Sequence, residues 1–113
     1  MTKQGESKLS SNIMKELRKR GAFCFKVHGS VTMMAGLPDI ICCYKGHFIG
    51  FETKMPAKKD NVSAAQARVH ELIRQAGGKA VVVWSVPMAV KELQAIDQAT
   101  LALVEAIASS HRR

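Results

Sequence analysis

The sequence is most constrained by a predicted β-hairpin between residues 39 and 54. Residues 40–44 and 47–51 are two short runs rich in β-prone apolar side chains, and Lys45-Gly46 between them is typical of a tight hairpin turn. With these two residues as the turn, the pairing of the strands is fixed, and it places Asp39 directly opposite Glu52. Lys54 lies two residues beyond Glu52 and therefore shares its face of the strand.

This register predicts that two carboxylates and one ammonium group meet at the end of the hairpin. Directly opposite residues have Cβ atoms roughly 4.5–5.5 Å apart, and two carboxylates so close repel each other unless a cation joins them or one keeps a proton. Carboxylate oxygens suit Mg²⁺ or Mn²⁺, which bind substrate phosphates and activate water. We therefore predict that Asp39 and Glu52 are metal ligands, and that Lys54 orients a water or stabilises charge on a phosphate.

The alternative interpretation is a cluster of surface salt bridges, because charged residues usually lie in solvent. Apolar residues, however, occupy both faces of the hairpin, which predicts central strands that are covered on both sides. One predicted face carries Ile41, Cys43, Phe48 and Gly50, and the other carries Ile40, Cys42, Tyr44, Ile49, Phe51 and Thr53. Charges on covered strands need a specific reason, so we favour the functional interpretation.

Length and charge predict one basic domain spanning residues 1–113. The 17 lysines and arginines outnumber the 9 aspartates and glutamates, which gives a net charge of +8. This excess favours an anionic partner, nucleic acid first, although a basic protein without such a partner can have the same composition. An apolar content of 47% is typical of a folded globule and argues against disorder.

The cysteines and histidines argue against disulfides and zinc. The three cysteines are an odd number without CxxC spacing, which indicates core thiols in a reducing compartment. The four histidines have no partners at metal-ligand spacing. We find no apolar signal region and no segment long enough to span a membrane, so we expect a cytoplasmic protein without a membrane partner.

Residues 7–20 are predicted to form an amphipathic helix, with Leu9, Ile13 and Leu17 on its buried stripe. Glu6 continues this stripe toward the sheet if the helix begins earlier. If Ser7 is the N-cap, Glu6 is only a favourable charge at the start of the helix.

The remaining segments alternate between predicted strands and helices. We expect a strand at 22–27, a loop at 28–37, a strand at 79–84, a short helix at 86–93 and a helical segment at 95–109. His28 and Ser30 in the loop, and Lys58 and Lys59 after the hairpin, are candidate nucleic-acid contacts, with ordinary solvated loops as the alternative. The 95–109 segment has little polar face, so it is either buried on more than one side or packed on a second subunit.

Residues 63–66 have the pattern of a capping box, with Ser63 as the N-cap of a helix at about 64–76 and Gln66 reaching back. Gln66 precedes Val69 by three residues and Ile73 by seven, so it also points toward the sheet. The cap explains Gln66 without any catalytic role, and the two roles compete for one side chain.

Pro38-Asp39 followed by Glu52-Thr53-Lys54 resembles the signature of PD-(D/E)XK nucleases. With a glycine two residues before the proline, the motif is similar to that of the virus-type replication-repair nuclease (VRR-NUC) domain. The order of elements is similar to the αβββαβ core of restriction-endonuclease-like α/β folds, a mixed central sheet flanked by helices. This resemblance covers about residues 6–93 and leaves a C-terminal helical extension at about 94–113.

The resemblance implies a Mg²⁺-dependent DNA endonuclease, in which Mn²⁺ can substitute. It implies that Glu6 lies beside the metal site, that Gln66 completes the catalytic set, and that the Thr53 main-chain carbonyl is a metal ligand; threonine at this position is a mild departure from the family pattern. The chain further resembles stand-alone phage-type nucleases similar to Holliday junction resolvases. That likeness implies a homodimer acting on branched DNA and a phage or prophage origin. The alternatives are a non-catalytic nucleic-acid-binding module and a small interaction protein.

Overall fold

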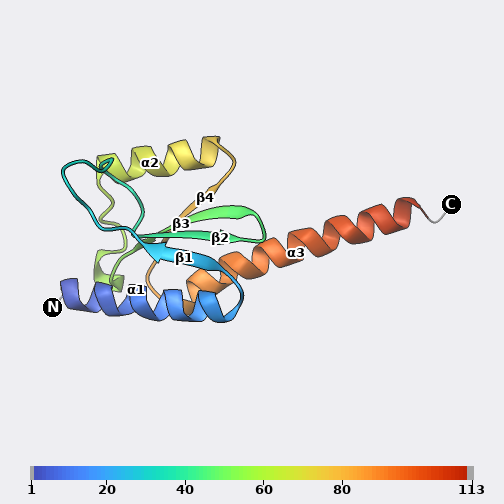
Figure 1. Ribbon diagram of the computed structural model, residues 1–113, viewed down its shortest axis with the longest axis horizontal. Coiled ribbons are helices and arrows are strands. Elements are labelled where there is room, and N and C mark those ends of the chain that lie inside the picture. Colours follow the sequence, from blue (N-terminus) through green and yellow to red (C-terminus); the bar gives the residue numbers. More distant parts are fainter. Residues whose placement is uncertain (1, 112–113) are drawn as a thin grey trace.

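The computed structural model describes residues 2–111, with side chains described from Gly5 onward. In chain order the elements are α1 (Thr2–Lys19), β1 (Phe23–Lys26), β2 (Ile40–Tyr44), β3 (His47–Thr53), the short 3₁₀ helix η1 (Pro56–Lys58), α2 (Ala64–Gln75), β4 (Lys79–Val83) and α3 (Val86–Ser110). The four strands form one mixed sheet in the order β1-β2-β3-β4, in which only the β3–β4 pair is parallel. Helices α1 and α3 cover one face of the sheet and α2 lies over the other (Figure 1). The predicted αβββαβ order is confirmed.

The hairpin has the predicted turn and register. Lys45 has a φ of 50° and Gly46 a φ of 84°, and two positive φ angles are what a two-residue type I′ turn requires. The ladder then runs from the Tyr44–His47 pair at the turn to the Ile40–Phe51 pair at the far end, as predicted. Asp39 directly precedes the first residue of β2, so it lies at the end of the sheet where β3 finishes.

Helix α1 begins at Thr2, earlier than the predicted start at residue 7. Tertiary contacts account for the longer helix: a Cβ at Gly5 would come within 3.1 Å of the Met55 side chain, so the helix start packs closely on the segment after β3. Glu6 therefore lies inside the helix and not at its cap. Helical spacing puts it on the same side as the buried Ser10 and Ile13. Glu6 therefore continues the buried stripe toward the sheet, which is the first of the two alternatives given for it.

The hydrophobic core lies between the sheet and the α1–α3 layer. Ile13, Ile40, Ile49 and Phe51 have no exposed surface there. The opposite face of the sheet is less well covered than predicted, because α2 contacts β4, at the other edge of the sheet from β1. Phe23 on β1 consequently remains 68% exposed.

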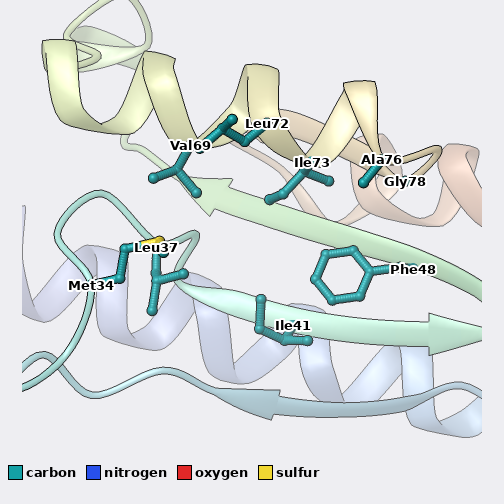
Figure 2. Close-up of a pocket in the computed structure, with 9 residues that line it drawn as sticks. All are labelled: Met34, Leu37, Ile41, Phe48, Val69, Leu72, Ile73, Ala76 and Gly78. Carbon is teal, nitrogen blue, oxygen red and sulfur yellow. The ribbon is translucent and has the colours of Figure 1, made fainter.

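An apolar pocket of about 360 Å³ opens between α2 and the β2–β3 hairpin (Figure 2). Its lining consists of Met34, Leu37, Ile41, Phe48, Val69, Leu72, Ile73, Ala76 and Gly78. None of these side chains is ionisable, so this pocket is not the candidate active site.

Helix α3 is one continuous helix of 25 residues, not a short helix followed by a separate segment. It runs unbroken because Leu93 and Ile96 are both buried in the core, and because the Asp97 carboxylate accepts hydrogen bonds from the Tyr44 hydroxyl and the Lys45 ammonium. Beyond Asp97 every described residue is exposed, and the helix projects from the body (Figure 1). The expectation that this segment is buried on more than one side within the chain is wrong. No described helix is long and apolar enough to cross a membrane.

Candidate active site

The loop before β2 is held against both the sheet and α2. The Val27 amide donates to the Asp39 carbonyl oxygen at 2.7 Å, which fixes the backbone at the start of the hairpin. Gly36 has a φ of 90°, and a Cβ there would come within 2.3 Å of the Ala65 carbonyl oxygen. Only glycine therefore lets the loop pass this close to the first turn of α2.

The Asp39 carboxylate is oriented by Thr53. Its Oδ2 accepts hydrogen bonds from the Thr53 amide at 2.8 Å and from the Thr53 hydroxyl at 2.9 Å. The same hydroxyl lies 2.9 Å from the buried Ser10 hydroxyl on α1. The sequence predicted only a main-chain role for Thr53, whereas its side chain links α1 to Asp39.

Glu52 is the most deeply buried charged residue of the cluster, with 2% of its surface exposed. Its Oε2 accepts a hydrogen bond from Gln66 Nε2 at 3.1 Å and lies 3.7 Å from Lys54 Nζ. Burial, and then the neighbouring Asp39 carboxylate, raises the pKa of Glu52 to about 8, while the Lys54 ammonium offsets part of this rise. The structure thus brings Asp39, Glu52, Lys54 and Gln66 together.

The Gln66 side chain makes the capping contact and reaches Glu52 at the same time. Its Oε1 accepts from the Ser63 amide at 2.9 Å, and the Ser63 hydroxyl accepts from the Gln66 amide at 3.1 Å, which completes the capping box. Its Nε2 at the same time donates to Glu52. The two contacts do not compete for the side chain, because the two ends of one amide group serve different partners, and the catalytic role of Gln66 stays a prediction.

We expect Gln66→Glu to separate the two roles. A glutamate at this position can still accept from the Ser63 amide, so α2 should keep its cap, but it cannot donate to Glu52 and it adds a third carboxylate. The metal-dependent DNA cleavage that the family resemblance implies should fall at least tenfold in Gln66→Glu. The matched variant Ser63→Ala should lose about 1 kcal/mol of stability and keep its activity. Urea unfolding and cleavage assays on both variants check this, and equal activity losses would contradict it.

Glu6 lies on the site side of α1, one helical turn before Ser10, and is partly exposed. Its carboxylate makes no hydrogen bond or ion pair with Asp39, Glu52 or Lys54, so the structure brings it near the cluster without joining it.

The predicted nucleic-acid contacts are all exposed and lie on either side of the hairpin in sequence. Ser30 lines a cavity of about 450 Å³ that Asp39 also lines, and its hydroxyl lies 3.0 Å from that of Thr32. His28 does not line this cavity. Lys58 ends η1, and Lys59 Nζ lies 5.4 Å from the centre of the Trp84 ring.

His70 belongs to the cluster and was missed by the sequence prediction. It is buried on α2, and its Nε2 lies 3.9 Å from Glu52 Oε1. Burial lowers the pKa of His70, and the Arg74 and Lys54 cations lower it further. The available signal was helical spacing, because His70 follows Gln66 by one turn and shares its face of α2.

The sequence profile of a known family, described as archaeal Holliday junction resolvase (Hjc), matches residues 1–109. The chain belongs to this resolvase family. The family consists of nucleases that act on branched DNA, so the predicted resemblance to resolvase-like nucleases is confirmed. No curated protein sequence matches the chain.

Solved structures share the resolvase fold. A VRR_NUC domain superposes with a TM-score of 0.61 at 22% identity, covering 80% of this chain and 95% of that one. A second VRR_NUC domain protein gives a TM-score of 0.59 at 21% identity, over 79% and 84% of the two chains. The Hjc Holliday junction resolvase of Archaeoglobus fulgidus gives 0.52 at 24% identity, over 67% and 64%.

The donor set of this resolvase-family chain fits a hard divalent cation. The described residues contain no group of three or more His, Cys, Asp and Glu side chains placed to hold a metal. Two carboxylates are nevertheless enough for Mg²⁺, which commonly keeps several waters and binds substrate phosphates. The buried Oε1 of Glu52 has no hydrogen-bond partner among the described residues, so it is available as a ligand. Asp39 and Glu52 would hold such an ion, and the Thr53 main-chain carbonyl stays a predicted ligand.

Proposed function

We propose that the chain is a Mg²⁺-dependent endonuclease that hydrolyses phosphodiester bonds in branched DNA, four-way junctions included. The observation that carries this proposal is the carboxylate pair of the buried Glu52 and the partly exposed Asp39, held beside Lys54 at the end of the hairpin in a chain of the resolvase family. Such a pair is unfavourable without a proton or a cation between its members, and a structural salt-bridge cluster would not need it.

In this proposal each side chain has a defined task. Asp39 and Glu52 bind Mg²⁺, which when bound supplies Lewis acidity and an activated water. The Lys54 ammonium orients that water and stabilises the negative charge that develops on the phosphate. Gln66 keeps Glu52 oriented by its hydrogen bond, and Glu6 approaches the site from α1.

The exposed basic segments extend this site into a DNA-binding surface. Lys58 and Lys59 follow directly after β3 and are exposed, and His28 and Ser30 lie in the loop that leads to Asp39. We propose that the lysines contact the phosphate backbone and that Ser30 donates to a phosphate oxygen.

We expect Lys54→Met to lower kcat roughly 100-fold at saturating Mg²⁺, because it removes one preorganised donor to the transition state. DNA affinity should change little, since only 14% of the Lys54 side chain is exposed. Lys58→Met is the matched control: it should weaken DNA binding in a salt-dependent manner and leave kcat unchanged. Single-turnover cleavage and binding titrations distinguish the two variants.

We further propose that the chain acts as a homodimer. The projecting part of α3 carries four exposed apolar side chains, Leu101, Leu103, Val104 and Ile107, and such surfaces are typical of interaction sites. Leu103→Lys combined with Ile107→Lys should shift the protein toward monomer in analytical ultracentrifugation. Gln98→Lys, on the same exposed stretch of helix, should not, and a monomeric wild type would contradict the proposal.

The decisive experiment incubates the protein with supercoiled plasmid and with a four-way junction, in Mg²⁺, in Mn²⁺ and in chelator. Metal-dependent cleavage that disappears in Asp39→Ala and Lys54→Ala supports the proposal. Cleavage that continues in chelator, or that persists in both variants, would contradict it. A non-catalytic binding module would instead bind DNA in chelator and cleave under none of these conditions.

A further inference from the structure

His70 is a buried residue with a ring nitrogen left unpaired in the described part of the chain. Its side chain is 4% exposed, and its Nε2 has no hydrogen-bond partner among the described residues. Glu52 Oε1 is in the same condition, and the two atoms face each other at 3.9 Å. Leaving two such groups unpaired lowers the stability of the folded state, so a buried pair of this kind calls for an explanation.

The separation of the two atoms indicates how they can interact. At 3.9 Å they are too far apart for a direct hydrogen bond, but one water can bridge them with bonds of about 2.8 Å to each. A ring nitrogen of histidine that carries its proton can donate to such a water, and the water can in turn donate to the carboxylate oxygen.

The two oxygens of Glu52 are treated differently by their neighbours. Gln66 and Lys54 both approach Oε2, whereas His70 is the partner that faces Oε1. Without a donor on that side, the carboxylate would be held by one oxygen only.

We propose that His70 is a positioning residue for the metal site, whose Nε2–H holds Glu52 Oε1 through one bridging water. This inference rests on the proposed function. The carboxylate is then fixed from both sides and presents one orientation to a divalent cation. Groups that orient metal ligands in this way are worth about 10–100-fold in metal affinity.

The test measures Mn²⁺ binding directly, by electron paramagnetic resonance titration of free Mn²⁺ at pH 8. His70→Leu fills a similar volume without a donor, and it should weaken binding about 10–100-fold. His70→Gln places an amide nitrogen near the position of Nε2 and should bind within about threefold of wild type. His47→Leu, at an exposed histidine beside the hairpin turn, is the control and should bind as wild type does.

The outcomes separate this inference from the proposed function. Unchanged Mn²⁺ affinity in His70→Leu, with binding still lost in Asp39→Ala, would overturn the role of His70 and leave the nuclease proposal standing. Equal weakening in His70→Leu and His70→Gln would also overturn it, because packing alone would then explain the effect. Absence of Asp39-dependent Mn²⁺ binding in the wild type would overturn both.

Discussion

Asp39→Asn is expected to lower Mg²⁺-dependent cleavage of a four-way junction at least ~1000-fold. In the proposed site the Asp39 carboxylate would hold the ion that stabilises the transition state. A ~1000-fold loss of rate corresponds to about 4 kcal/mol of this stabilisation. Asparagine can still accept from the amide and hydroxyl of Thr53, so the local structure should survive. Single-turnover cleavage at saturating Mg²⁺ measures the effect.

Two controls separate lost chemistry from lost structure. Asp60→Asn removes the same charge from an exposed loop residue and should cleave as wild type does. Junction binding by Asp39→Asn in Ca²⁺ should remain within a few-fold of wild type. Cleavage by Asp39→Asn within tenfold of wild type would show that Asp39 is not a metal ligand.

Glu52→Gln is expected to gain stability over wild type as the pH rises, when metal is chelated. The unfolded Glu52 loses its proton near pH 4.5, whereas folded Glu52 keeps it until about pH 8. Between these values the folded state binds more protons, so the wild-type free energy of unfolding falls as pH rises. The loss is at most about 1.4 kcal/mol per pH unit, or up to about 5 kcal/mol in total.

Urea unfolding of both proteins at pH 4.5, 6, 7 and 8.5 in chelator tests this linkage. Other groups titrate alike in the two proteins, so their effects largely cancel when the free energies of unfolding are subtracted. The remaining difference should grow with pH and level off above about pH 8. Saturating Mg²⁺ should reverse the difference, because it stabilises only the protein with an ionised Glu52. A difference that does not vary with pH would mean that folded Glu52 titrates normally.

The centre of the site was predictable from the sequence because turn chemistry fixed the register. Lys45 and Gly46 accept the positive φ angles of a two-residue turn, and the pairing of every later residue follows from them. Asp39, Glu52 and Lys54 could therefore be brought together without any knowledge of tertiary packing. The capping box at Ser63 was equally local and is confirmed.

The parts that were missed depend on contacts between distant segments. The first turn of α1 is stabilised by packing on Met55, and the continuity of α3 by the contact of Asp97 with the hairpin turn. His70 carries no motif of its own, and only the packing of α2 against the sheet turns it toward Glu52. Periodicity assigns a residue to a face of a helix but not to a partner.

The side-chain amide of Gln66 couples the folding of α2 to the candidate active site, because its oxygen caps the helix and its nitrogen donates to Glu52. A slip of the helix by one residue would break the cap and withdraw the donor from Glu52 together, so α2 has one setting in which both are satisfied. Substitutions of Gln66 made for thermal tolerance are therefore expected to alter activity as well, whereas Ser63→Ala, which leaves the Gln66 amide in place, is not. Position 66 is the place where a screen for stability and a screen for activity would select on the same atoms.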